Sequence, residues 1–182
     1  MRHLPNIICL CRILLIWPII DGLLGGAYER TLLLFVVAAA SDGLDGWLAK
    51  RYGWTSRLGI WLDPLADKLL LVSVFLVLTW QGQVPFYLAV AAVSRDVMIA
   101  LGAVSFRFLW GPVRGRPILS SKINTVLQLL YILLVVTHAA WAQPPDSVLQ
   151  AMVAVICLTV LYSGIAYLRE FTLRALHVAA QP

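Results

Sequence analysis

The chain has 182 residues, of which 61% are hydrophobic and 13% are charged, and its formal net charge is +5. A soluble domain of this length has a small core, so much of this apolar surface would face water. The composition therefore excludes an ordinary soluble domain and predicts an all-α integral membrane protein. Its scattered basic residues suit loops beside anionic lipid, so we expect no nucleic-acid partner.

Six stretches are long and apolar enough to cross a membrane, which takes about 20 residues for a helix. They lie at 7–25, 30–50, 59–80, 84–108, 119–141 and 147–168. The chain shows no internal repeat and no soluble linker, so we expect residues 1–182 to form one bundle of six transmembrane helices. The first stretch carries Arg12 and lacks a small-x-small cleavage pattern, so we expect it to be retained.

The basic residues are distributed unevenly over the connections between these stretches. Lysine and arginine accumulate on the cytoplasmic side of membrane proteins. One side holds Arg30 alone, whereas the other holds Arg2, Lys50, Arg51, Arg57, Arg107, Arg114, Arg116, Lys122, Arg169 and Arg174. This bias predicts that both termini are cytoplasmic. We expect a bacterial inner membrane, with the mitochondrial inner membrane as the alternative.

Four acids cluster where the second and third stretches meet the cytoplasmic side. They are Asp42, Asp45, Asp63 and Asp67. A charge within a membrane costs several kcal/mol, so such acids face the bundle interior or water. Spacings of three and four place each pair on one helix face, and antiparallel helices would bring the pairs together. Because clustered carboxylates suit Mg²⁺ or Mn²⁺, we predict a divalent metal site for one ion or two.

Two alternatives stay open for these acids. They could form ion pairs without metal, using Lys50, Arg51, Arg57 or Lys68. They could also mark the path of a membrane cation transporter, although the chain lacks the repeated halves typical of that class. Small residues on the same helices, Gly43, Gly46, Ala49 and Gly59, would let a ligand or a second helix approach closely.

The residues around these acids resemble the signature of the CDP-alcohol phosphatidyltransferases, D-x2-D-G-x2-A-R-x8-G-x3-D-x3-D. The matching segments are Asp42-Gly-Leu-Asp-Gly-Trp-Leu-Ala-Lys50 and Gly59-Ile-Trp-Leu-Asp-Pro-Leu-Ala-Asp67. Every fixed position and spacing agrees except Lys50, where the family has arginine. The resemblance continues through Pro5-Asn6, Arg12, Ser94-Arg95-Asp96 and residues 121–128.

This resemblance implies a six-helix membrane enzyme, usually dimeric, that moves the phosphatidyl group of CDP-diacylglycerol to an alcohol. It implies that Asp42, Asp45, Asp63 and Asp67 hold the metal, that Asp67 is also the general base, and that Gly46, Ala49 and Gly59 line the CMP moiety. Lys50 would contact phosphate as a point charge, because lysine lacks the planar fork of arginine. Lys50 also leaves open a catalytically inactive homologue that acts as a membrane assembly partner.

The acceptor alcohol must be inferred from residues outside the signature. Basic groups that could bind an acceptor phosphate are Arg95, Lys122, Arg114 and Arg116, although topology explains Arg114 and Arg116 equally well. Residues 94–98 and 121–128 are most similar to CMP-forming cardiolipin synthases, whose acceptor is phosphatidylglycerol. Asn124 stands where phosphatidylglycerophosphate synthases usually have lysine, and glycerol 3-phosphate is the alternative acceptor. We expect His138 and the cysteines Cys9, Cys11 and Cys157 to be structural.

Overall fold

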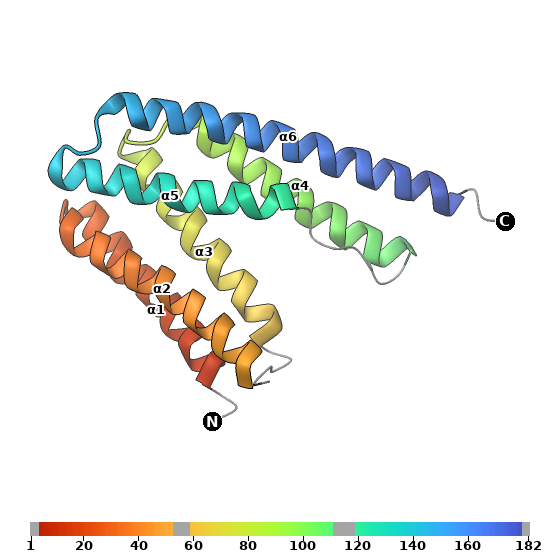
Figure 1. The fold of residues 1–182 in the computed structure, drawn as a ribbon, viewed down its shortest axis with the longest axis horizontal. Coiled ribbons are helices and arrows are strands. Elements are labelled where there is room, and N and C mark those ends of the chain that lie inside the picture. Colours follow the sequence, from red (N-terminus) through yellow and green to blue (C-terminus); the bar gives the residue numbers. More distant parts are fainter. Residues whose placement is uncertain (1–3, 53–58, 111–118, 180–182) are drawn as a thin grey trace. The chain divides into compact units, whose positions relative to one another are not determined.

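The computed structural model describes residues 4–52, 59–110 and 119–179 and is helical throughout, apart from short turns (Figure 1). The six helices in these ranges are α1 (Leu4–Leu24), α2 (Tyr28–Tyr52), α3 (Gly59–Trp80), α4 (Phe86–Trp110), α5 (Leu119–Trp141) and α6 (Asp146–Ala179). Within the helices, the description leaves out the side chains of residues 4–7, 42, 44–50, 52, 59–64, 103, 106–110, 119–121, 170, 171 and 173–179. The predicted all-α architecture is confirmed.

The helix bounds follow the apolar stretches of the sequence closely except at the end of α6. The predicted ranges 59–80 and 119–141 coincide with α3 and α5, and the bounds of α1, α2 and α4 differ by at most three residues. Helix α6 continues eleven residues beyond the predicted 168, to Ala179. The prediction measured apolar length, but residues 169–179 contain neither proline nor glycine and therefore remain good helix formers.

The described residues divide into two compact units. The first comprises Met1–Val84 and Ile132–Pro145, and the second comprises Pro85–Tyr131 and Asp146–Pro182. In the first unit α1 packs against both α2 and α3, and in the second α4 packs against α6. The division crosses α5, whose two halves belong to different units.

The core of the first unit follows from helical spacing. Helix α3 buries Ala66, Leu70, Val74 and Leu78. Residues four apart lie on one face of a helix, so these side chains form a continuous apolar stripe. Helix α1 likewise buries Cys9, Ile19 and Leu23, and the two helices are in contact. Burial of these faces fixes which further side chains of α1 and α3 can meet.

Polar side chains tie the helix ends of the first unit together, opposite the end that carries the four acids along α2 and α3. Gln81 Nε2 donates to the Leu23 carbonyl at 2.7 Å, and Gln83 Nε2 donates to the Tyr28 hydroxyl at 2.8 Å. His138 Nδ1 lies 2.7 Å from the Pro144 carbonyl oxygen, which confirms that a neighbour satisfies this histidine. The three cysteines are free, so none forms a disulfide.

Gly22 marks the closest approach of α1 to the start of α2. A Cβ atom at this position would collide with Thr31 Oγ1, whose hydroxyl donates to the Ala27 carbonyl at 2.9 Å. We expect Gly22→Ala to destabilise the protein by about 1–3 kcal/mol, the usual cost of overpacking, and to lower Tm in detergent. At Gly164 a Cβ would meet Met98 Cε at an ordinary 3.8 Å, so Gly164→Ala is the matched control.

A second substitution tests whether this collision is the cause. Thr31→Ala removes the Oγ1 atom, so the Gly22→Ala, Thr31→Ala double variant should be less destabilised than the sum of the two single variants. An unchanged Tm for Gly22→Ala alone would show that α1 and α2 do not approach as closely as the structure indicates.

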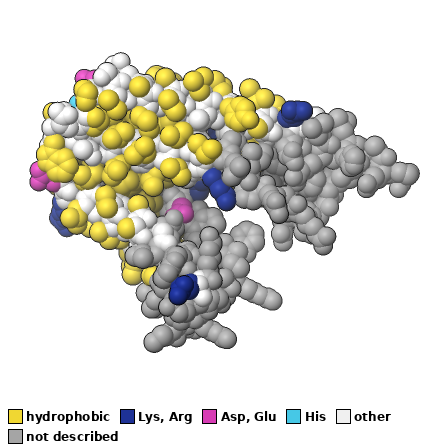
Figure 2. All heavy atoms as spheres, viewed as in Figure 1, with side chains coloured by type: hydrophobic (Ala, Val, Ile, Leu, Met, Phe, Trp, Pro, Cys, Tyr) yellow, Lys and Arg dark blue, Asp and Glu magenta, His cyan; other side chains and the backbone are white. Residues whose placement is uncertain are grey.

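Hydrophobic side chains cover much of the described surface in the view of Figure 2, and many large apolar residues are exposed. Outward-facing positions of α6 show this most clearly, since Leu158, Leu161, Tyr162 and Ile165 are all exposed. Among the described residues, the segments Lys122–Trp141 and Asp146–Arg169 are long and apolar enough to cross a membrane, with mean hydropathies of 1.7 and 2.1.

Candidate functional site

The four predicted metal-binding acids lie on two helices of the same unit. Positions 42 and 45 belong to α2, and positions 63 and 67 belong to α3. The side chains of Asp42, Asp45 and Asp63 lie outside the described residues, as do those of Ala49 and Lys50 and the surroundings of Gly46 and Gly59. Among the side chains that are described, no three acids, histidines or cysteines gather around one point. Convergence of the four acids therefore stays a prediction.

Asp67 forms an ion pair with an arginine from the first helix. Arg12 Nη1 lies 2.5 Å from Asp67 Oδ1, although the two residues are 55 positions apart in the sequence. The side chain of Arg12 is 1% exposed, whereas that of Asp67 is 42% exposed. Asp67 is thus held by a buried cation while much of its carboxyl side chain stays accessible to a ligand.

Helical spacing explains why these two side chains meet. Arg12 follows Cys9 by three residues and precedes Ile19 by seven, so it lies on the buried face of α1. Asp67 precedes Leu71 and Phe75 by four and eight residues, and both are buried on α3. Since these faces belong to helices in contact, the apolar packing of α1 on α3 brings the guanidinium to the carboxylate. A buried arginine is tolerated because it is paired.

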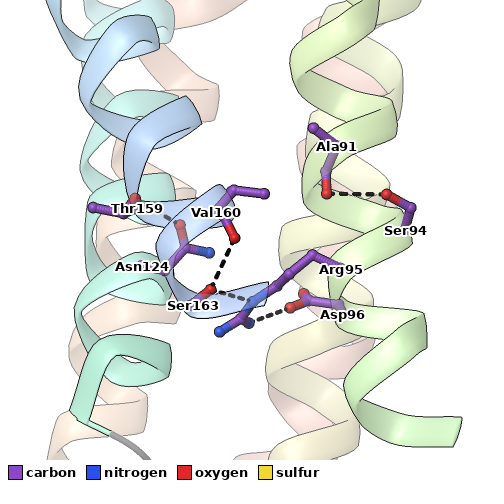
Figure 3. A network of polar contacts seen from close by, with 8 residues as sticks. All are labelled: Ala91, Ser94, Arg95, Asp96, Asn124, Thr159, Val160 and Ser163. Carbon is purple, nitrogen blue, oxygen red and sulfur yellow. Dashed lines mark hydrogen bonds and ion pairs between the residues drawn. The ribbon is translucent and has the colours of Figure 1, made fainter. Parts of the chain in front are cut away.

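A second buried arginine organises the polar interior of the other unit (Figure 3). Arg95 of α4 is 4% exposed and donates through Nε to Ser163 Oγ at 2.9 Å. Its Nη1 lies 2.7 Å from Asp96 Oδ1, and its guanidinium carbon lies 5.8 Å from the centre of the Tyr167 ring. Nη2 of Arg95 is buried and has no hydrogen-bond partner among the described residues. One nitrogen of this fixed cation therefore remains available for an acceptor atom.

Two side chains of α5 extend this polar interior. Asn124 and Gln128 are both fully buried and, four residues apart, lie on one face of the helix. Thr159 Oγ1 of α6 lies 3.0 Å from Asn124 Oδ1 (Figure 3). Asn124 Nδ2 and both polar atoms of the Gln128 side chain have no partner among the described residues. Burying such groups without partners is costly, so they mark a place where polar ligand atoms or water would be stabilised.

The interior of this unit changes from apolar to polar toward one end of each helix. On α6 the buried face runs from Val153, Ile156 and Val160 to Ser163, and on α4 it runs from Leu88 and Ala92 to Arg95. Arg95 and Ser163 lie near the middle of α4 and α6, and Asn124 and Gln128 lie in the N-terminal half of α5. The predicted topology assigns the C-terminal ends of α4 and α6 and the N-terminal end of α5 to the cytoplasmic side.

The structure does not bring all the predicted acceptor residues together. Lys122 is exposed on α5, two residues before buried Asn124, and side chains two residues apart on a helix do not share a face. Arg95, by contrast, lies in the buried network described above. Arg114 and Arg116 lie outside the described residues.

Several partners in these networks were not singled out from the sequence. They are the ion pair of Arg12 with Asp67 and the contributions of Thr159, Ser163 and Tyr167 to the second unit. The sequence contained a signal for some of them. An arginine within an apolar stretch requires a partner, and Thr159 and Ser163 are hydroxyl residues at a helical spacing of four within α6.

Comparison with known proteins identifies similar chains among lipid-synthesising transferases. A cardiolipin synthase (CMP-forming) of Streptomyces coelicolor is 35% identical over 102 residues, which cover 53% of this chain and 47% of that protein. A cardiolipin synthase (CMP-forming) of Rattus norvegicus is 34% identical over 146 residues, covering 71% and 48%. A CDP-diacylglycerol--glycerol-3-phosphate 3-phosphatidyltransferase of Haemophilus influenzae is 40% identical over 73 residues, covering 38% and 39%.

The chain spans about half the length of the curated relatives with the longer matches. The family model of the CDP-alcohol phosphatidyltransferases matches residues 2–168, which is most of the chain and includes α1 to α5, both buried arginines and all four acids. The chain belongs to the CDP-alcohol phosphatidyltransferase family.

Proposed function

We propose that this protein transfers the phosphatidyl group of CDP-diacylglycerol to an alcohol and releases CMP. The observation that carries the proposal is the half-exposed carboxylate of Asp67, held by buried Arg12 in the unit whose helices also contain Asp42, Asp45 and Asp63. Membership of the family and the names of the relatives support the same reaction. The full signature of acids argues against an inactive assembly partner.

In the proposed reaction Asp67 accepts the proton of the acceptor hydroxyl. The hydroxyl oxygen attacks the phosphorus that bears the diacylglycerol, a new P–O bond forms, and the P–O bond to CMP breaks. CMP leaves with the electron pair of that bond, and the proton passes from Asp67 to water. Gly46, Ala49 and Gly59 would line the CMP moiety, and Lys50 would contact the pyrophosphate as a point charge.

The residues fit a site for Mg²⁺ or Mn²⁺. Carboxylate oxygens are the ligands that these cations prefer, and 42% of the Asp67 side chain is exposed. A carboxylate has two oxygens with several lone-pair positions, so pairing through Oδ1 leaves Asp67 able to ligate. Asp42, Asp45, Asp63 and Asp67 would hold one or two ions, which would neutralise charge on the pyrophosphate and the leaving CMP.

We propose that the acceptor is phosphatidylglycerol. Arg95 would bind its phosphate through Nη2, and Lys122, Arg114 and Arg116 would attract it electrostatically. Asn124 is neutral, which suits a phosphodiester better than the more highly charged phosphate of glycerol 3-phosphate. Glycerol 3-phosphate is the second candidate, because relatives of Haemophilus influenzae and Mycobacterium tuberculosis carry names for that reaction or its product.

The proposed setting is a membrane in which all six helices span the bilayer and both termini are cytoplasmic. The exposed apolar side chains of α6 and the two long apolar segments support contact with lipid. Basic residues beside the ends of α2, α4 and α6 support the orientation. We propose a homodimer in a bacterial inner membrane with the active site facing the cytoplasm; the mitochondrial inner membrane is the alternative.

CMP release from the purified protein tests this function. In detergent with Mg²⁺ or Mn²⁺ and CDP-diacylglycerol, we expect CMP release that requires phosphatidylglycerol and stops when EDTA removes the metal. Release that requires glycerol 3-phosphate instead would identify a phosphatidylglycerophosphate synthase. A folded preparation that releases no CMP with either acceptor, or with other alcohols, would contradict the proposal.

A further inference from the structure

The two charged side chains that are buried in the described part of the chain are both arginines, and each is paired with an aspartate. Arg95 is already proposed, from the sequence, to bind the phosphate of the acceptor. Arg12 has no such role in the proposed reaction, yet it is the more completely buried of the two, at 1% exposure against 4%. Burying a guanidinium in an apolar helix interface is energetically costly, so the position of Arg12 calls for a functional explanation.

The pair of Arg12 and Asp67 is unequal in burial. Each charged partner of an ion pair that leaves water costs desolvation energy, so burial of Arg12 alone keeps the carboxylate of Asp67 in contact with solvent. Here the cation is buried and the carboxylate is 42% exposed. The buried partner is fixed by its neighbours on α1, and the exposed partner is the side chain that can meet a ligand.

From this geometry we infer that Arg12 is a positioning residue for Asp67. This role rests on the proposed function: Arg12 orients the Asp67 carboxylate, which takes the proton of the acceptor hydroxyl. The guanidinium holds Oδ1 from the α1 side, which restricts rotation of the Asp67 side chain and directs the carboxyl group toward its accessible side. Arg12 also places a positive charge beside Asp67, which stabilises the ionised carboxylate.

Replacement of Arg12 tests the inference through kcat. We expect Arg12→Met to lower kcat for CMP release by about tenfold or more, because misplacing a reacting group is costly, while KM for CDP-diacylglycerol stays the same. Arg12→Lys keeps a charge but not the planar fork, so its kcat should lie between those of Arg12→Met and wild type. Arg169→Met removes an exposed arginine from α6 and should leave kcat unchanged.

Folding is measured on the same preparations by size-exclusion elution and Tm. Arg12→Met at wild-type kcat would overturn the inference and leave the ion pair a purely structural contact. If Arg12→Met does not fold, Arg12→Lys decides, and a folded Arg12→Lys protein with wild-type kcat would overturn the role of the guanidinium. Failure of the proposed function is distinguishable, because wild type itself would then release no CMP with any acceptor.

Discussion

Asp67→Asn is expected to lower the rate of CMP release by about a thousandfold, within the range that general bases contribute. The amide cannot take the acceptor proton, and it is a poorer ligand than carboxylate for a divalent cation. It nevertheless keeps the shape of the side chain and an oxygen that can accept from Arg12 Nη1, so the contact between α1 and α3 can persist. The measurement is kcat for CMP release at saturating CDP-diacylglycerol, acceptor and Mg²⁺.

The matched control is Asp21→Asn, which makes the same change at an exposed acid of α1 in the same unit. It should retain wild-type kcat. Removing the negative charge from Asp67 also removes compensation for buried Arg12, so some loss of Tm is expected for Asp67→Asn. The proposed role of Asp67 would be wrong if folded Asp67→Asn protein released CMP within a few-fold of the wild-type rate.

The fold could be predicted because the sequence contains apolar stretches that are long enough to span a membrane. Residues 59–80 and 119–141 were predicted to the residue. The end of α6 was not, because helix formation and membrane burial obey different rules: a helix continues through polar residues such as Arg169 and Thr172 as long as no breaker intervenes. Hydrophobicity determines how many residues of a helix can lie in the membrane, whereas helix propensity determines where the helix ends.

The candidate site was predictable in its residue types and less so in its pairings. Spacing along one helix placed Asp67 on a particular face, but the partner of Asp67 comes from α1, 55 residues earlier. The pairing of Asp67 with Arg12 depends on how α1 packs on α3. Contacts between distant elements are set by tertiary packing, which periodicity does not encode.

The same limit applies to the acceptor residues. Arg95, within the fourth apolar stretch, and Lys122, near the start of the fifth, have the same predicted role as basic groups that could bind an acceptor phosphate. The structure separates them, because Arg95 is buried against Ser163 whereas Lys122 is exposed. Burial distinguishes a cation that can make a fixed, directional contact from one that contributes only a screened field. This difference makes Arg95 the sharper target for a test of acceptor binding.

Arg95→Met should raise KM for the acceptor roughly a hundredfold, since a hydrogen bond to a charged group contributes about 1.5–3 kcal/mol. The available Nη2 donor disappears, together with the positive charge that would face the acceptor phosphate. KM for CDP-diacylglycerol should change little, because the residues proposed to bind the donor belong to α2 and α3, whereas Arg95 belongs to α4. The measurement is CMP release against phosphatidylglycerol concentration in mixed micelles.

Two further variants separate loss of binding from loss of folding. Arg95→Met deprives Asp96, which is 14% exposed, of one ion-pair partner, whereas the Arg95→Met, Asp96→Asn double variant removes both charges and should recover part of any lost Tm. Recovery of Tm without recovery of acceptor KM would show that Arg95 acts on the acceptor. Ser163→Ala removes only the oxygen that accepts from Arg95 Nε, so its effect on KM should be smaller. A wild-type acceptor KM in the folded double variant would contradict binding of the acceptor phosphate by Arg95 and would favour Lys122, Arg114 and Arg116 as its basic partners.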